Sequence, residues 1–81
     1  MSPLLQWLTS ELDNALAAYP PDEQPDMLRK WADRWTDRYE LFLRTGKDYA
    51  PHPTHGAPTA ADFLGIIGEC TVRVVKMREA A

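Results

Sequence analysis

Two histidines and one cysteine are the side chains in this 81-residue sequence best suited to metal binding or nucleophilic chemistry. His52 and His55 flank a Pro-Thr pair, and this spacing can supply two nitrogen ligands, with Cys70 or Asp62 as a third. Metal-binding pairs usually lie on rigid elements, however, and Pro53 constrains the directions of the two rings. With no second cysteine and no third histidine, solvated loop histidines are the favoured interpretation, and a metal site is the alternative.

Cys70 would need an adjacent base to act as a nucleophile. Its predicted place is the apolar stripe of a helix, with Ile66, Ile67 and Val74, where a thiol behaves as a small hydrophobic group with a raised pKa. The acidic residues fall on predicted solvated helix faces or in caps. The Thr-Gly-Lys run at 45–47 follows a helix, whereas a phosphate-binding loop leads into one. The sequence therefore predicts a protein that is not an enzyme.

A row of basic residues marks the middle of the chain. Lys30, Arg34 and Arg38 recur at every fourth position and so line one flank of a predicted helix. With Arg44, they could contact phosphates while neighbouring tryptophans stack on bases, as in a nucleic-acid-binding regulator. Acidic residues alternate with this row and would repel a nucleic-acid backbone. A solvated helix face is therefore favoured over nucleic-acid binding.

Trp7 is the aromatic residue that the predicted core does not need. It lies well round the first helix from the Leu8–Leu12 stripe, with polar Ser10 and Glu11 beside it. A tryptophan on a helix flank can anchor a protein partner, because aromatic residues supply many interface hot spots. Packing of Trp7 against a long loop is the alternative. The predicted partner-binding residues are Trp7, Glu11, Lys30, Arg34, Arg38 and Tyr49.

Two amphipathic helices must position these side chains in the first half of the chain, at about residues 3–19 and 24–45. Ser2 can cap the first helix, and Pro3 suits its first position. Apolar residues then recur every three to four positions until a Pro-Pro pair ends the helix. The second helix carries a stripe that includes two tryptophans, assigned to the core, and closes at Gly46, which suits a left-handed cap.

The segment 46–58 contains three prolines and two glycines, so it is predicted to be a long loop that straps over one end of the domain. A third helix is expected at 59–78, capped by Thr59 and with Asp62 in its first turn. Residues 71–77 are β-branched and partly alternating, as in a strand. An isolated strand would leave an unpaired edge, so a helix is favoured there.

Gly65 and Gly68 make one side of the third helix nearly flat and permit the close approach of another backbone. That backbone belongs either to another helix of the same chain or to the same helix of a second copy, in a symmetric homodimer. Packing within the chain is the favoured interpretation. A homodimer is the alternative, because association stabilises small domains.

Length and charge limit the class of protein. A chain of 81 residues with one cysteine forms one domain without an intramolecular disulfide, and a net charge of −3 excludes a globally basic nucleic-acid binder. Residues 1–26 carry five acidic and no basic residues, so the charge is unevenly divided. No targeting segment or membrane-spanning stretch is recognised, so a cytoplasmic location is expected.

The sequence therefore predicts an all-α fold, a small three-helix antiparallel bundle in a single domain over residues 1–81. Its expected function is that of a non-enzymatic protein-interaction module, a small adaptor or inhibitor that binds a larger protein and needs no cofactor. Phage and other mobile elements encode accessory proteins of this kind. Two alternatives are a nucleic-acid-binding regulator using the basic row, and a small-molecule or metal binder at the loop, centred on Tyr49, His52 and His55.

Overall fold

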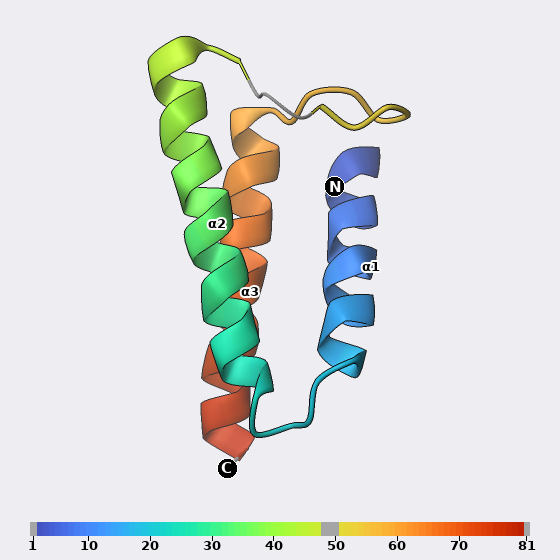
Figure 1. Ribbon diagram of the computed structural model, residues 1–81, viewed down its shortest axis with the longest axis vertical. Helices are drawn as coiled ribbons and strands as arrows, with labels where there is room; N and C mark the ends of the chain where they lie inside the picture. Colours follow the sequence, from blue (N-terminus) through green and yellow to red (C-terminus); the bar gives the residue numbers. More distant parts are fainter. Residues whose placement is uncertain (1, 48–50, 81) are drawn as a thin grey trace.

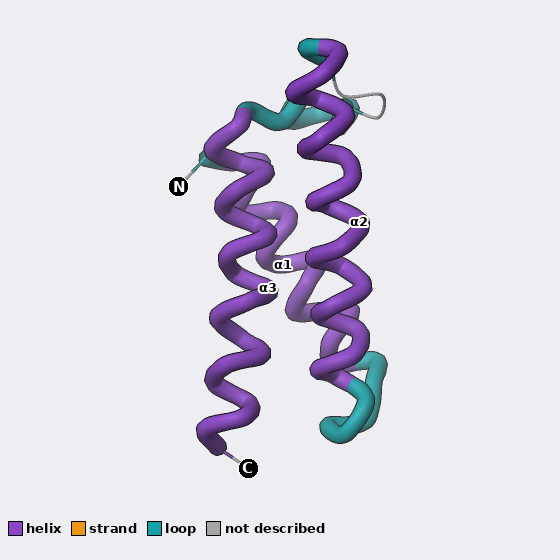
Figure 2. The backbone as a smooth tube through the Cα atoms, turned by 90° about the vertical axis from the view of Figure 1, so that its left-hand side faces the viewer, coloured by secondary structure: helices purple, strands orange, loops and turns teal. Residues whose placement is uncertain are grey.

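The computed structural model describes residues 2–47 and 51–80 and contains three helices, α1 (Pro3–Ala17), α2 (Gln24–Thr45) and α3 (Ala60–Ala80). Successive helices run in opposite directions, with α2 and α3 side by side and α1 packed along them (Figure 1). Figure 2 shows α1 behind the other two, so the three form a bundle and not a flat layer. The predicted all-α three-helix fold is confirmed.

The core is formed by the apolar stripe of each helix. Around Phe63, which is fully buried, the rings of Trp35, Tyr39 and Phe42 lie at centroid distances of 5.9, 5.6 and 5.2 Å. These tilted aromatic contacts join α2 to α3. Cys70 is also fully buried, and burial raises the pKa of its thiol to about 11. The predicted core positions of Trp35 and Cys70 are therefore confirmed.

The bounds of α2 agree with the expected 24–45, whereas α3 spans 60–80 instead of 59–78 and α1 is two residues shorter than expected. α1 ends at Ala17 and not at Tyr19, because the carbonyl of Leu16 accepts the backbone N–H of Tyr19 at 3.1 Å and the side-chain amide of Gln24 at 3.0 Å. These bonds satisfy a carbonyl that the helix end leaves open. Gly46 takes the predicted left-handed conformation, with φ of 74°.

α3 continues as a helix through residues 71–77, so the strand alternative is wrong. The hydroxyl of Thr71 donates to the carbonyl of Ile67 at 3.1 Å, within the helix. Val74 and Met77 pack against the core. Their contacts with the other helices outweigh the preference of β-branched residues for strands. None of the three helices, over the ranges described, is long and apolar enough to cross a membrane.

One carboxylate connects the first turns of α1 and α3. The hydroxyl of Ser2 accepts the N–H of Leu5 at 3.0 Å, as predicted, and donates to Asp62. Asp62 also accepts the backbone N–H of Thr59 at 2.9 Å, while the Thr59 hydroxyl accepts the N–H of Asp62 at 3.3 Å. Burial raises the pKa of Asp62, but the hydrogen bonds from Ser2 and Thr59 outweigh burial and hold the pKa below its ordinary value of 3.8.

Gly65 lies where α1 packs on α3. A Cβ atom at this position would lie 2.5 Å from Cδ2 of Leu5, whereas a Cβ at Gly68 would meet nothing within 4 Å. The close approach predicted at Gly65 is therefore to another helix of the same chain, the interpretation favoured from the sequence. The open side of Gly68 lies on the same helix as exposed Leu64 and Val72.

Asp62→Asn is expected to lower the free energy of unfolding near neutral pH by about 1–3 kcal/mol, because the charged acceptor shared by Ser2 and Thr59 is lost. The folded-state pKa of Asp62 is depressed, so its carboxylate stabilises the protein above the unfolded-state pKa and ceases to do so as pH falls through the folded-state pKa. Urea titrations of both proteins, with exposed Asp37→Asn as the control, should show the difference shrinking in acid. A difference that does not change with pH contradicts this role.

Gly68→Ala is expected to raise the free energy of unfolding by up to about 1 kcal/mol, because alanine is the better helix former and the added methyl group meets open space. Gly65→Ala should gain less or lose stability, since the side chain of Leu5 must move. Urea denaturation measures both changes. In a Leu5→Ala background the two substitutions should become equal in effect, and equal gains with Leu5 present would contradict the predicted contact.

Candidate functional site

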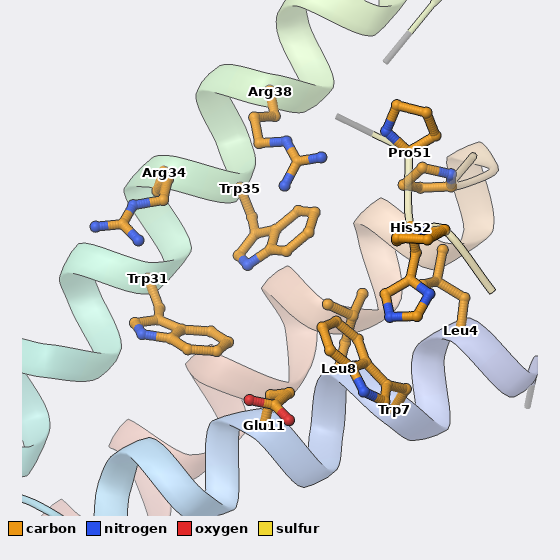
Figure 3. Close-up of a pocket in the computed structure, with 12 residues that line it drawn as sticks. Leu4, Trp7, Leu8, Glu11, Trp31, Arg34, Trp35, Arg38, Pro51 and His52 are labelled. Carbon is orange, nitrogen blue, oxygen red and sulfur yellow. The ribbon is translucent and has the colours of Figure 1, made fainter. Parts of the chain in front are cut away.

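An open cleft of about 340 Å³ lies between α1 and α2, beneath the loop that precedes α3. Figure 3 shows the side chains that face it. Three segments contribute the lining: Leu4, Trp7, Leu8 and Glu11 from α1, Trp31, Arg34, Trp35 and Arg38 from α2, and Pro51, His52, Pro53 and Pro58 from the loop.

The cleft brings together four of the predicted partner-binding residues, Trp7, Glu11, Arg34 and Arg38. Lys30 is exposed and lines a separate hollow beside the turn between α1 and α2. Steps of four residues advance about 40° round a helix, so the predicted basic row winds away from the cleft at its Lys30 end. Tyr49 lies outside the described residues.

Trp7 packs against the loop and remains partly open. Its ring centroid lies 4.3 Å from that of His52, with the planes tilted by 59°. The residue is nevertheless 37% exposed. Trp7 therefore packs against the long loop, which is the alternative that the sequence analysis gives. This packing leaves part of the indole facing the cleft, so a role as a partner anchor stays a prediction.

A tight turn organises the two loop histidines. Backbone hydrogen bonds of 2.9 and 2.8 Å join His52 and Gly56, and Gly56 takes a left-handed φ of 79°. Nδ1 of His52 accepts the backbone N–H groups of Thr54 and His55, each at 3.0 Å. This nitrogen is occupied, and no group of three or more potential metal ligands gathers in the described part of the chain. The metal-site alternative gains no support from this geometry.

The α2 wall of the cleft combines guanidinium and indole groups. The guanidinium carbon of Arg38 lies 4.2 Å from the ring centroid of Trp35, in a cation–π arrangement. Arg34 is exposed one turn earlier and forms no ion pair or hydrogen bond within residues 2–47 and 51–80. Trp31, which is half-buried, lies beyond it along the same wall.

Glu11 provides the carboxylate of the opposite wall. Its side chain extends from α1 into the cleft, between Trp7 and Trp31 (Figure 3). The residue is half-buried, and it has no hydrogen-bond or ion-pair partner in the part of the chain that the structure describes. The cleft therefore presents an apolar floor, indole surfaces and unlike charges on its two walls, a combination suited to binding.

Some lining residues were not predicted. Helical spacing assigns Trp31 and Trp35 to the core, and in the structure they also face the cleft. Pro51, Pro53 and Pro58 were recognised only as parts of a long loop. Their number shows that the segment is irregular, but local sequence does not indicate which helices it covers.

The chain was compared with protein-family models, with curated proteins and with solved structures. No family model matches it. No curated protein and no solved structure is significantly similar to it.

Proposed function

We propose that this chain is a non-enzymatic protein-interaction module, a small cytoplasmic adaptor or inhibitor that binds a larger protein at the cleft between α1 and α2. The observation that carries the proposal is that all three tryptophans of the chain line this one open cleft. Tryptophan is enriched among the residues that dominate binding energy at protein interfaces. The proposed role includes that of an accessory protein of the kind found in phage and other mobile elements.

The exposed part of Trp7 supports a role in binding a partner in addition to its packing against the loop. Trp7 retains more than a third of its surface in contact with solvent even with His52 against it. The volume of the cleft, about 340 Å³, falls in the range of about 300–1,000 Å³ typical of binding pockets. A partner side chain seated there would remove indole and leucine surface from water, which favours association.

A nucleic-acid-binding regulator is the second candidate, supported by Arg34 and Arg38 beside indole rings. The carboxylate-bearing Glu11 lines the same cleft, and Asp33 and Asp37 are exposed on α2, next to Arg34 and Arg38 in the sequence. These carboxylates weaken the counterion release on which binding to a phosphate backbone depends. A protein partner is therefore preferred.

The alternative of a homodimer concerns a surface of α3 and not the cleft. Because Leu5 covers Gly65, a second copy would have to use the outer side of α3 around Gly68. Leu64, Val72 and Val75 are exposed on that helix. Their exposure supports a surface around Gly68 in place of the expected face that includes both Gly65 and Gly68.

Affinity capture with the tagged chain in lysate of its source cell tests the proposal. The wild-type chain should retain one stoichiometric protein, and Trp7→Ala should weaken that interaction by about 30-fold or more, the effect of losing one hot-spot side chain. Leu43→Ala, which removes an apolar side chain 62% exposed and outside the cleft, should retain the protein.

Circular dichroism of each variant establishes that the helices are intact. The proposal fails if the wild-type chain retains no protein, or if Trp7→Ala retains as much as the wild type. Retention of nucleic acid that is lost as salt is raised would favour the second candidate instead.

A further inference from the structure

Two opposite charges, one on each wall of the cleft, form no ion pair with the residues that the structure describes. Glu11 stands on the α1 wall and Arg34 on the α2 wall, and both line the same space. They form no ion pair with each other or with another residue that the structure describes. A half-buried carboxylate without a partner has lost part of its hydration and gains from a cation brought to it.

The surroundings of Glu11 suit a cation. Trp7 lies one turn before it on α1, and Trp31 faces it from α2 (Figure 3). No ring contact joins these two indoles, so the space between them is not filled by their own stacking. A guanidinium or ammonium group in that space would meet indole surfaces and a carboxylate, which together favour a positive charge.

The α2 wall favours the opposite charge. Arg34 lies one turn along the helix from Trp31, and its guanidinium has the fork geometry that binds carboxylates. A ligand carrying only a cation would be repelled by Arg34 and Arg38, and one carrying only an anion would be repelled by Glu11. A ligand that carries both charges side by side satisfies both walls, so the cleft discriminates against either charge alone.

We infer that the cleft binds a partner segment in which an arginine or lysine side chain stands next to a carboxylate. The cation lies between Trp7 and Trp31 against Glu11, and the carboxylate pairs with Arg34. This inference rests on the proposed function, since it specifies the chemistry of the protein partner at the same cleft. The volume of the cleft, about 340 Å³, is sufficient for one long side chain and its neighbour.

Intrinsic tryptophan fluorescence provides a direct test, because all three tryptophans line the cleft. The probes are blocked tetrapeptides, Ala-Arg-Glu-Ala and the two forms in which either charge is replaced by glutamine. At low salt the doubly charged peptide should bind about fivefold more tightly than either singly charged one, the effect of about 1 kcal/mol. Equal affinities, or the tightest binding by the peptide that retains only glutamate or only arginine, overturn the inference.

Two variants assign the charges to the walls. Glu11→Gln should abolish the advantage that arginine gives the peptide, and Arg34→Gln should abolish the advantage that glutamate gives. Lys30→Gln is the matched control, because it removes a positive charge from α2 outside the cleft and should leave all affinities unchanged. An equal effect of Lys30→Gln and Arg34→Gln would show that only net charge matters and would refute the site.

Retention of the captured partner by the variants tests this inference and the proposed function separately. If Trp7→Ala abolishes retention of the partner while Glu11→Gln and Arg34→Gln retain it as Lys30→Gln does, the cleft is the interface but the charge pairing is wrong. If retention does not depend on Trp7, the proposed function fails, whatever the peptides show.

Discussion

The buried carboxylate of Asp62 is the interaction on which the arrangement of the helices depends. It accepts hydrogen bonds from the backbone N–H of Thr59 at the start of α3 and from the Ser2 hydroxyl that caps α1, so one charged group joins the starts of two helices. Leu5 lies against Gly65 one turn further on, and Arg73 of α3 pairs with Asp13 nearer the other end of α1. α1 is therefore fixed along α3, and its flank that carries Trp7 and Glu11 is left facing α2.

The packing of α1 along α3 explains why the cleft lies between α1 and α2. The aromatic cluster around Phe63 fills the space between α2 and α3, and the contacts of Leu5 fill part of the space between α1 and α3. The space between α1 and α2 is covered at one end by the loop, through His52 on Trp7, and stays open beside Glu11 and Arg34. Opposed charges and indoles therefore meet on the side of the bundle that its own core does not close.

Features set by neighbouring residues were predictable from the sequence, and features set by distant contacts were not. Ser2, Gly46 and Thr59 act on their own helix ends, so capping preferences identified them. The position of the loop on Trp7, and the link from Ser2 to Asp62, join residues far apart in the chain. Helical spacing placed Arg34 and Arg38 on one flank but assigned both tryptophans of that helix to the core, because periodicity does not distinguish a buried face from the edge of a cleft.

The burial of Cys70 makes the reactivity of its thiol a measure of how often the core opens. A fully buried thiol with a pKa near 11 reacts with thiol reagents chiefly when α3 opens from the rest of the bundle. The cleft and the hollow that Cys70 lines have no residue in common. The rate of labelling therefore measures the opening of the core, and a ligand that slowed labelling from within the cleft would show that the two sides of the bundle are energetically coupled.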